Sequence, residues 1–115
     1  TGFTGGIGWA FTELLASYGF NLVLMGRNPE KLAARKIYLE KYYPKIQFDI
    51  VETDFDIPDS VSKAEEKIKV FFETHDIGIV VNNVAMAEGA EYQNTDPEGL
   101  LRVANVNSRV NKQMT

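Results

Sequence analysis

The chain has 115 residues, about the length of one ordinary domain, and 44% of them are hydrophobic and 24% charged, as in folded globular proteins. The formal net charge is −4 and no cluster of Lys or Arg occurs, which argues against a nucleic-acid partner. One histidine and no cysteine exclude disulfides and thiolate catalysis and leave too few ligands for a structural zinc site. No apolar run is long enough to span a bilayer.

Helical and strand-like periodicities alternate from the start of the chain. A first helix is expected because apolar residues recur at helical spacing, and Gly19 is expected to cap it. Its apolar face consists of Ile7, Phe11, Leu14, Leu15 and Tyr18. Residues 21–26 (NLVLMG) form a short apolar run, which predicts a buried strand. Asn28 then predicts an N-cap, with Pro29 at the first position of a second helix that must end before Pro44.

The second helix is expected to bury one face, and the alternation continues after it. The residues of that face are Leu32, the stem of Lys36, Leu39 and Tyr43. Residues 46–51 (IQFDIV) and 77–81 (IGIVV) are predicted strands, and a third helix is expected from about Asp59. Its apolar face consists of Val61, Ala64, Ile68, Phe71 and Phe72, and Glu65 and Lys69 form an i,i+4 pair on its charged face.

A last helix is expected after a capping box formed by Thr95 and Glu98. It carries Leu100, Leu101, Ala104 and Val110. Strands that are apolar throughout and alternate with helices indicate a parallel sheet that helices cover on both faces. The predicted fold class is therefore α/β, with a doubly wound sheet, and residues 1–115 are expected to belong to one partial domain.

The glycine-rich segment Thr1–Gly8 (TGFTGGIG) opens directly into the first helix. Glycines in such a segment make the tight turn from strand to helix, let the backbone approach a pyrophosphate, and let the helix pack close to the sheet. The helix N-terminus then offers N–H groups to the phosphates. No Gly-Lys-Ser/Thr follows, so the segment is not a P-loop. It predicts a dinucleotide-binding site rather than a purely structural turn.

The end of the second strand indicates which dinucleotide is bound. An NAD site commonly has Asp or Glu about 20 residues after the glycines, where it binds the ribose hydroxyls. Here the corresponding residues 25–28 are MGRN, without a carboxylate. The planar guanidinium of Arg27 is suited to a 2′-phosphate, so NADP is favoured over NAD, although an ordinary solvated arginine is the alternative.

The same residues resemble the short-chain dehydrogenase/reductase family. Thr1 and the glycines at 2, 6 and 8 match its TGxxxGxG motif, although 2, 5 and 8 also fit the TGxxGxxG spacing of the extended branch. Residues 82–85 (NNVA) resemble the NNAG element of the compact branch, with Val84 in place of Ala and Ala85 in place of Gly. Residues 22–32 and 76–86 resemble a subgroup, the very-long-chain 3-oxoacyl-CoA reductases and 17-beta-hydroxysteroid dehydrogenases, whose NNVG form explains Val84 and which use NADP(H).

This resemblance implies a Rossmann-type sheet and a set of cofactor-binding residues. The residues expected to line the phosphates are Gly2, Thr4, Gly6, Ile7 and Gly8. Arg27 is expected to hold the 2′-phosphate, Asp54 to lie beside the adenine, and Asn82 and Ala85 to border the ribose and nicotinamide. Asn105 matches the helix asparagine of the family's catalytic tetrad, which holds a water in the proton relay, and Asn107 is a rival for that match.

Several parts of the family pattern are not found. Trp9 stands where charged residues are frequent, and no basic residue precedes Gly6, which weakens the NADP prediction slightly. No Tyr-x-x-x-Lys occurs, and Tyr38 and Tyr42 each have a lysine at the third place instead of the fourth. The first strand is expected immediately before Thr1, and the Ser and the Tyr/Lys pair beyond Asn105, past the end of the chain. The 115 residues alone are expected to be inactive and either marginally stable or prone to aggregation.

The function favoured by these features is an NADP(H)-dependent oxidoreductase that interconverts a ketone and a hydroxyl group on a small lipid-like substrate, a 3-oxoacyl-CoA or a steroid. A non-catalytic NADP-binding module or sensor is the first alternative, and an extended-branch nucleotide-sugar epimerase or dehydratase is the second. The resemblance further implies that hydrophobic segments outside this chain hold the full-length protein at the endoplasmic reticulum membrane. A homodimer is also expected for the full-length protein.

Overall fold

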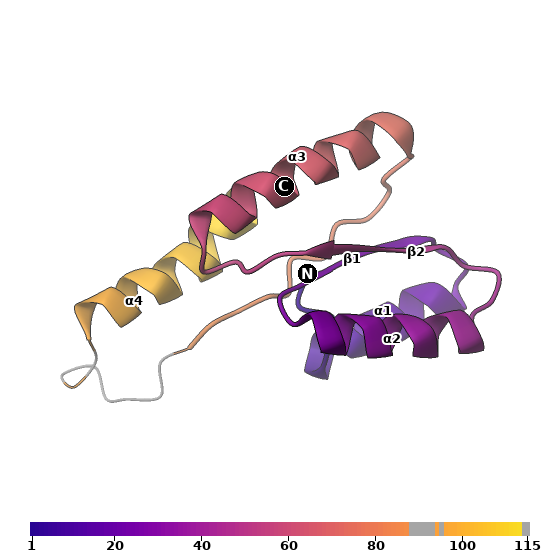
Figure 1. Cartoon of the computed structure of the whole chain (residues 1–115), viewed down its shortest axis with the longest axis horizontal. Helices are drawn as coiled ribbons and strands as arrows, with labels where there is room; N and C mark the ends of the chain where they lie inside the picture. Colours follow the sequence, from indigo (N-terminus) through magenta and orange to yellow (C-terminus); the bar gives the residue numbers. More distant parts are fainter. Residues whose placement is uncertain (88–93, 95, 114–115) are drawn as a thin grey trace. The chain divides into compact units, whose positions relative to one another are not determined.

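The computed structural model describes residues 1–87, 94 and 96–113 (Figure 1). The chain consists of two compact units, Thr1–Asp54 and Phe55–Thr115, and each has its own set of elements. The prediction of one partial domain over residues 1–115 stays a prediction.

The first unit is a βαβ arrangement preceded by a helix. Its elements are α1 (Gly6–Ser17), β1 (Leu22–Gly26), α2 (Pro29–Tyr42) and β2 (Phe48–Glu52). The two strands pair in parallel, with Leu22 opposite Phe48 and Gly26 opposite Glu52. Both helices lie on the same side of the strands (Figure 1). The parallel pairing with a helical crossover confirms the predicted α/β class, and these residues hold two strands of an incomplete Rossmann-type sheet.

The helices of the first unit begin and end where the local sequence predicts. The Asn28 side chain accepts a hydrogen bond from the Lys31 backbone N–H at 2.9 Å, and Pro29 occupies the first turn of α2. At the end of α1, Gly19 has a φ of 91° and its N–H donates to the Ala16 carbonyl at 3.1 Å. The Phe20 N–H donates to the Leu15 carbonyl, which completes a Schellman motif. The predicted caps Asn28 and Gly19 are therefore confirmed.

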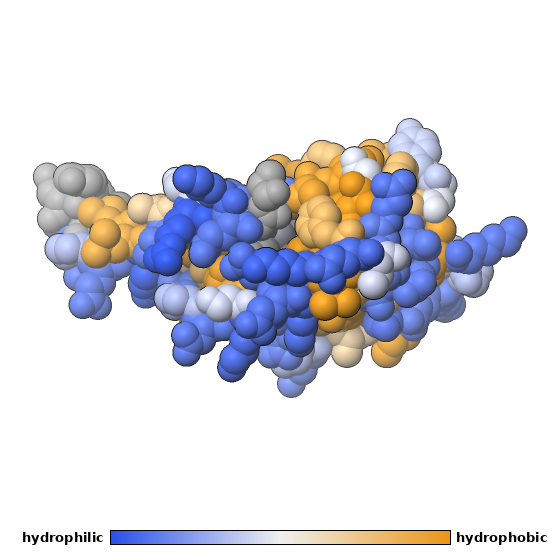
Figure 2. All heavy atoms as spheres, turned by 90° about the horizontal axis from the view of Figure 1, so that it is seen from above, coloured by the Kyte–Doolittle hydropathy of each residue, from blue (hydrophilic) through white to orange (hydrophobic). Residues whose placement is uncertain are grey.

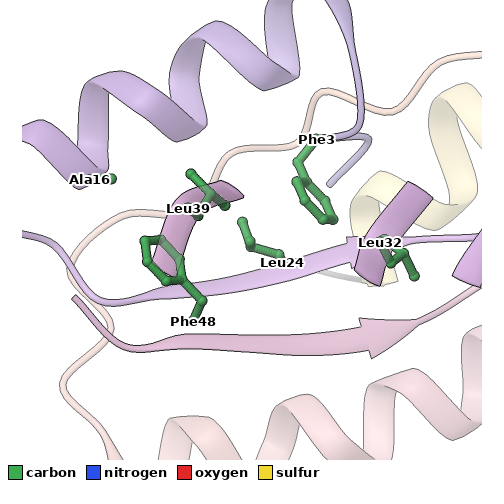
Figure 3. Close-up of a cluster of buried hydrophobic side chains, with 6 residues drawn as sticks. All are labelled: Phe3, Ala16, Leu24, Leu32, Leu39 and Phe48. Atoms are coloured by element: carbon green, nitrogen blue, oxygen red, sulfur yellow. The ribbon is translucent and has the colours of Figure 1, made fainter. Parts of the chain in front are cut away.

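A small apolar core fills the space between the helices and the strands of the first unit. Figure 3 shows side chains from the strands, from both helices and from the glycine-rich segment pointing toward one another. The buried members are Phe3, Ala16, Leu24, Leu32, Leu39 and Phe48. Leu39 is 0% exposed, as expected for the inner face of α2, while Tyr43 is only partly buried. Leu24 and Phe48 thus lie on the face of the strands that packs in this core, while Met25 and Val51, which alternate to the other face, are buried as well.

The prediction that α1 buries its apolar face is wrong. Ile7 is 71% and Tyr18 73% exposed, and Phe11 and Leu14 are exposed as well. The buried residues of α1 are instead Gly8, Thr12 and Ala16. Small side chains let the helix axis approach the strands closely, and Thr12 satisfies its hydroxyl by donating to the Gly8 carbonyl at 2.8 Å. The larger apolar side chains, such as Ile7 and Phe11, are exposed instead.

The second unit contains helices and no strand over its described residues. Its elements are α3 (Pro58–Thr74), α4 (Pro97–Ala104), the π-helix η2 (Asn105–Val110) and α5 (Asn111–Gln113). In α3, Val61 and Ala64 are buried as predicted, whereas Phe72 is exposed, contrary to the prediction. Phe72 lies next to the buried stripe at the edge of the charged face, where Glu65 and Lys69 pair at 3.5 Å. The predicted cap residue Thr95 lies outside the described residues, and α4 begins at Pro97 after Asp96.

Residues 77–81 form no strand in the described part of the chain, so that prediction is wrong for these residues. In the strand order 3-2-1-4, the neighbour of this segment is the strand expected before Thr1, which is not among the 115 residues. An apolar run becomes a strand only when its backbone groups find a ladder partner. Ile79 and Val80 are accordingly exposed. In Figure 2, hydrophobic patches lie at the surface beside hydrophilic side chains.

Candidate functional site

The glycine-rich segment turns at the carboxyl end of β1. The Gly2 N–H donates to the Met25 carbonyl at 3.0 Å, and the side chain of Phe3 is buried in the core of the first unit. Gly2 and Gly6 have φ values of 65° and 55°, in the left-handed region where residues with a Cβ are strained. The sequence thus folds into a turn that places the N-terminus of α1 at the strand edge where α/β proteins bind ligands.

The N-terminus of α1 is open. Gly5 is the N-cap, with extended backbone and no side-chain hydrogen bond to the first turn, and that turn contains no acidic residue. A Cβ built at Gly5 or at Gly6 would meet no atom within 4 Å. Among the described residues, the first turn of α1 therefore has no side-chain cap, and uncapped N–H groups at a helix N-terminus are suited to bind phosphate groups. The segment thus fits a pyrophosphate.

Arg27 and Asp54 follow the two strands at the same edge. Arg27 comes directly after β1, is exposed, and has no hydrogen-bond or ion-pair partner among the described residues. The Thr53 N–H donates to the Gly26 carbonyl at 2.8 Å, which keeps the ends of β1 and β2 together. Asp54 then lies half-buried immediately beyond. The structure therefore brings Arg27 and Asp54 to the edge where the glycine-rich segment turns.

The other predicted residues belong to the second unit, and one pair of contacts organises them. The Asn107 side chain accepts a hydrogen bond from the Met86 N–H and donates one to the Met86 carbonyl, both at 2.8 Å. Asn82 donates to the Asn111 carbonyl at 3.5 Å, while Ala85 is exposed. The segment that contains 82–86 is thus tied to η2 through Asn107, the rival of Asn105. The Asn105 side chain is exposed at the start of η2.

Arg35 is a residue of the site that the sequence analysis missed. It lies on α2 and donates a hydrogen bond from Nε to the Thr4 carbonyl at 3.3 Å. Its guanidinium carbon is 3.9 Å from the centroid of the Trp9 ring. The only signal in the sequence was Trp9, which stands where the family often has a charged residue. An aromatic ring at that place is explained by the cation stacked on it.

Tyr38 is not a candidate general acid in this structure. Partial desolvation raises the pKa of its phenol above the ordinary value, and the Glu13 carboxylate, which accepts its hydroxyl hydrogen at 3.2 Å, raises it further. A catalytic tyrosine of this family needs a pKa that a nearby lysine lowers below the ordinary value. Tyr38 instead packs against Trp9 and Tyr42, with ring centroids at 5.4 and 4.5 Å.

Replacing Gly6 by alanine in the full-length protein is expected to lower the free energy of unfolding by about 1–2 kcal/mol, because an L-residue at this φ is strained. Gly5→Ala is the matched control. Gly5 has equally open surroundings but an extended φ of −171°, which any residue adopts. Urea unfolding of both variants measures the difference, and equal stability of the two would contradict the conformation assigned to Gly6.

The parallel strand pair and the glycine turn are those of an incomplete Rossmann-type fold. The family model described as short chain dehydrogenase matches residues 1–112, so the chain belongs to this family. The resemblance stated from the motifs is thereby confirmed.

Among its relatives, the chain is 37% identical over 86 residues to a very-long-chain 3-oxoacyl-CoA reductase-like protein of Arabidopsis thaliana, which covers 75% of this chain and 26% of the relative. It is 38% identical over 86 residues to the inactive hydroxysteroid dehydrogenase-like protein 1 of Homo sapiens, covering 75% of this chain and 25% of the relative. A short-chain dehydrogenase from Sphingobium yanoikuyae, solved in complex with NADPH, superposes with a TM-score of 0.88 at 26% identity. That match covers 98% of this chain and 43% of the structure. The chain spans less than half the length of each of these proteins.

Two searches of the described residues concern other kinds of site. None of the helices in residues 1–87 and 96–113 is long and apolar enough to cross a membrane. No group of three or more His, Cys, Asp or Glu side chains gathers into a metal site in the same part of the chain.

Proposed function

We propose that this chain is the cofactor-binding part of an NADP(H)-dependent oxidoreductase. The observation that carries the proposal is the uncapped N-terminus of α1, reached through two glycines with positive φ at the carboxyl end of β1, with Arg27 at the same edge. Membership of the short chain dehydrogenase family supports it. When bound, the cofactor supplies or accepts the hydride, and the residues of this chain bind and orient it.

The preference for NADP over NAD rests on Arg27. Residues 25–28 contain no carboxylate to accept hydrogen bonds from ribose hydroxyls, and the Arg27 guanidinium is exposed and available for a phosphate. A planar, permanently charged fork binds a phosphate dianion more strongly than a neutral ribose. The NADPH bound to the Sphingobium yanoikuyae relative supports this preference.

The remaining contacts to the cofactor are proposed residue by residue. The backbone of the glycine-rich segment would receive the pyrophosphate at Gly2, Thr4, Gly6, Ile7 and Gly8. Asp54 would lie beside the adenine, and Asn82 and Ala85 would border the ribose and the nicotinamide.

For the helix asparagine of the proton relay, the contacts favour Asn107 over Asn105. Asn107 is locked to the Met86 backbone by two hydrogen bonds and sits within the π-helix η2. Its own carbonyl accepts a hydrogen bond from the Asn111 side chain at 2.9 Å, so a donor outside the helix backbone reaches it. A π-turn loosens the regular ladder of helix hydrogen bonds and is frequent at functional sites. A carbonyl of this kind is suited to hold the water that the relay requires.

The substrate class is proposed from the relatives. The names of the two relatives point to 3-oxoacyl-CoA thioesters and hydroxysteroids, which share a ketone or hydroxyl group on a large apolar body. The test is NADPH oxidation by the full-length protein, followed by absorbance, with a long-chain 3-oxoacyl-CoA and an oxosteroid offered separately. Consumption of NADPH with either substrate is the expected result, and its absence with both would contradict the proposed activity.

A non-catalytic NADP-binding module is the second candidate. It is favoured by the human relative, whose name describes an inactive protein. The same assay separates the two candidates, because a sensor would bind NADPH tightly and show no turnover. We further propose that the 115 residues by themselves are inactive. A location at the endoplasmic reticulum membrane and a homodimer rest on the family resemblance and stay predictions.

A further inference from the structure

One side chain of α2 contacts both the glycine-rich segment and the helix that follows it. Arg35 is half-buried, donates from Nε to the Thr4 carbonyl at 3.3 Å, and lies 3.9 Å from the centroid of the Trp9 ring. Thr4 lies within the turn and Trp9 in the first full turn of α1. No acidic partner of Arg35 occurs among the described residues, so the guanidinium is not held by an ion pair.

The stack beneath Arg35 is itself fixed by α2. The Trp9 ring meets Tyr38 edge-on with centroids 5.4 Å apart, and Tyr38 lies against Tyr42 at 4.5 Å. The Tyr38 hydroxyl donates to the Glu13 carboxylate on α1 at 3.2 Å. Two helices thus hold the indole in one orientation. A flat guanidinium on a fixed indole retains little rotational freedom, so the direction of its Nε–H is set as well.

The contact at Thr4 falls between two glycines of the segment. Thr4 lies between Gly2 and Gly6, which have φ values of 65° and 55°. Glycines on both sides give the unbound segment many conformations, and selecting one of them costs conformational entropy when a ligand binds. A hydrogen bond that fixes the carbonyl between them removes part of that cost before binding.

We infer that Arg35 is a positioning residue for the dinucleotide, which holds the segment around Thr4 in its binding conformation through the stack on Trp9. The inference rests on the proposed dinucleotide-binding function. It differs from the role of Arg27, because Arg35 acts on the backbone that receives the pyrophosphate. Since NADPH and NADH share the pyrophosphate, Arg35 raises the affinity for both to a similar extent.

The test compares Arg35→Met and Arg35→Lys in the full-length protein, with NADPH and NADH as the probes in separate titrations. Methionine keeps an apolar stem, and lysine keeps the charge but lacks the planar fork. Both variants are expected to weaken the binding of both dinucleotides by a similar factor, on the order of 10-fold. Lys36→Met is the matched control, because it removes a cation from the same helix. The partner of Lys36 is Glu40, at 3.7 Å. Its affinities are expected to equal those of the wild type.

A second measurement separates positioning from a general loss of folding. Amide hydrogen exchange of the folded, unliganded variants is expected to accelerate in residues 1–8 and to stay unchanged in β1 and β2. Three results would overturn the inference: full affinity in Arg35→Met, recovery of affinity in Arg35→Lys, or a loss confined to NADPH. If the wild-type protein bound neither dinucleotide, the proposed function itself would fail, and that result is distinct from the other three.

Discussion

Replacing Arg27 by alanine is expected to weaken NADPH binding by about 10- to 100-fold and to leave NADH binding nearly unchanged. Hydrogen bonds to charged groups contribute about 1.5–3 kcal/mol, and the 2′-phosphate that distinguishes the two cofactors carries the charge. Arg27 is exposed at the end of β1 and free of competing partners among the described residues, so it makes this contact without breaking another one. Titration calorimetry of the full-length variant with each dinucleotide measures the effect.

Two further variants control for net charge and for geometry. Lys45→Ala removes one positive charge at the opposite, amino-terminal end of β2, so it is expected to change neither affinity. Arg27→Lys keeps the charge without the planar fork and is expected to fall between the wild type and the alanine variant. An equal loss of NADPH and NADH binding in Arg27→Ala would show that Arg27 does not recognise the 2′-phosphate.

The second large effect is expected at Asn107. Asn107→Ala removes two hydrogen bonds of 2.8 Å to Met86 and leaves that backbone N–H and carbonyl without the side chain that satisfies them. At about 1 kcal/mol or more for each bond, the turnover number is expected to fall by about 10- to 100-fold. Met86 directly follows residues 82–85, so the substitution changes the backbone geometry at the end of that segment. We therefore expect kcat to decrease more than the affinity for NADPH. Steady-state kinetics of the full-length protein measures both.

Asn105→Ala is the matched control for this prediction. Asn105 lies on the same helix two residues earlier, and its side chain is exposed, so little change in kcat is expected. Asn107→Asp keeps the acceptor for the Met86 N–H and loses the donor to the Met86 carbonyl, and an intermediate rate is expected. If Asn105→Ala lost more activity than Asn107→Ala, the match of Asn105 to the family asparagine would be restored.

The sequence predicted the local features of the first unit well, because they depend on neighbouring residues. Asn28 with Pro29 marked the start of α2, and Gly19 marked the end of α1. The strands at 22–26 and 48–52 also lie within two residues of the apolar runs that predicted them. Caps and buried runs are decided over three or four residues, so a sequence alone carries the information.

Two predictions failed where distant partners decide the outcome. The apolar periodicity of α1 identified Ile7 and Phe11 correctly as one face, but the helix buries its small residues Gly8 and Ala16 instead. The run at 77–81 has strand composition, yet no ladder forms there in the described residues. Periodicity reports which residues are apolar, and burial depends on which elements are present to cover them.

The candidate site follows the same pattern, because the sequence indicated some of its residues and not others. The glycine motif and Arg27 could be proposed from the sequence because their spacing along the chain follows from the chemistry of a dinucleotide. Arg35 was missed because it meets Thr4 across 31 residues of sequence. The preference for Asn107 over Asn105 likewise appears only when η2 faces Met86, 21 residues away. Contacts between residues that are so far apart along the chain leave no spacing pattern in a single sequence.

The most direct test of the central claim is a calorimetric titration of the wild-type full-length protein with NADPH and with NADH. The open N-terminus of α1 and the cation at Arg27 predict that NADPH binds and that it binds more tightly than NADH. Tighter binding of NADH, or no binding of either dinucleotide, would contradict the claim.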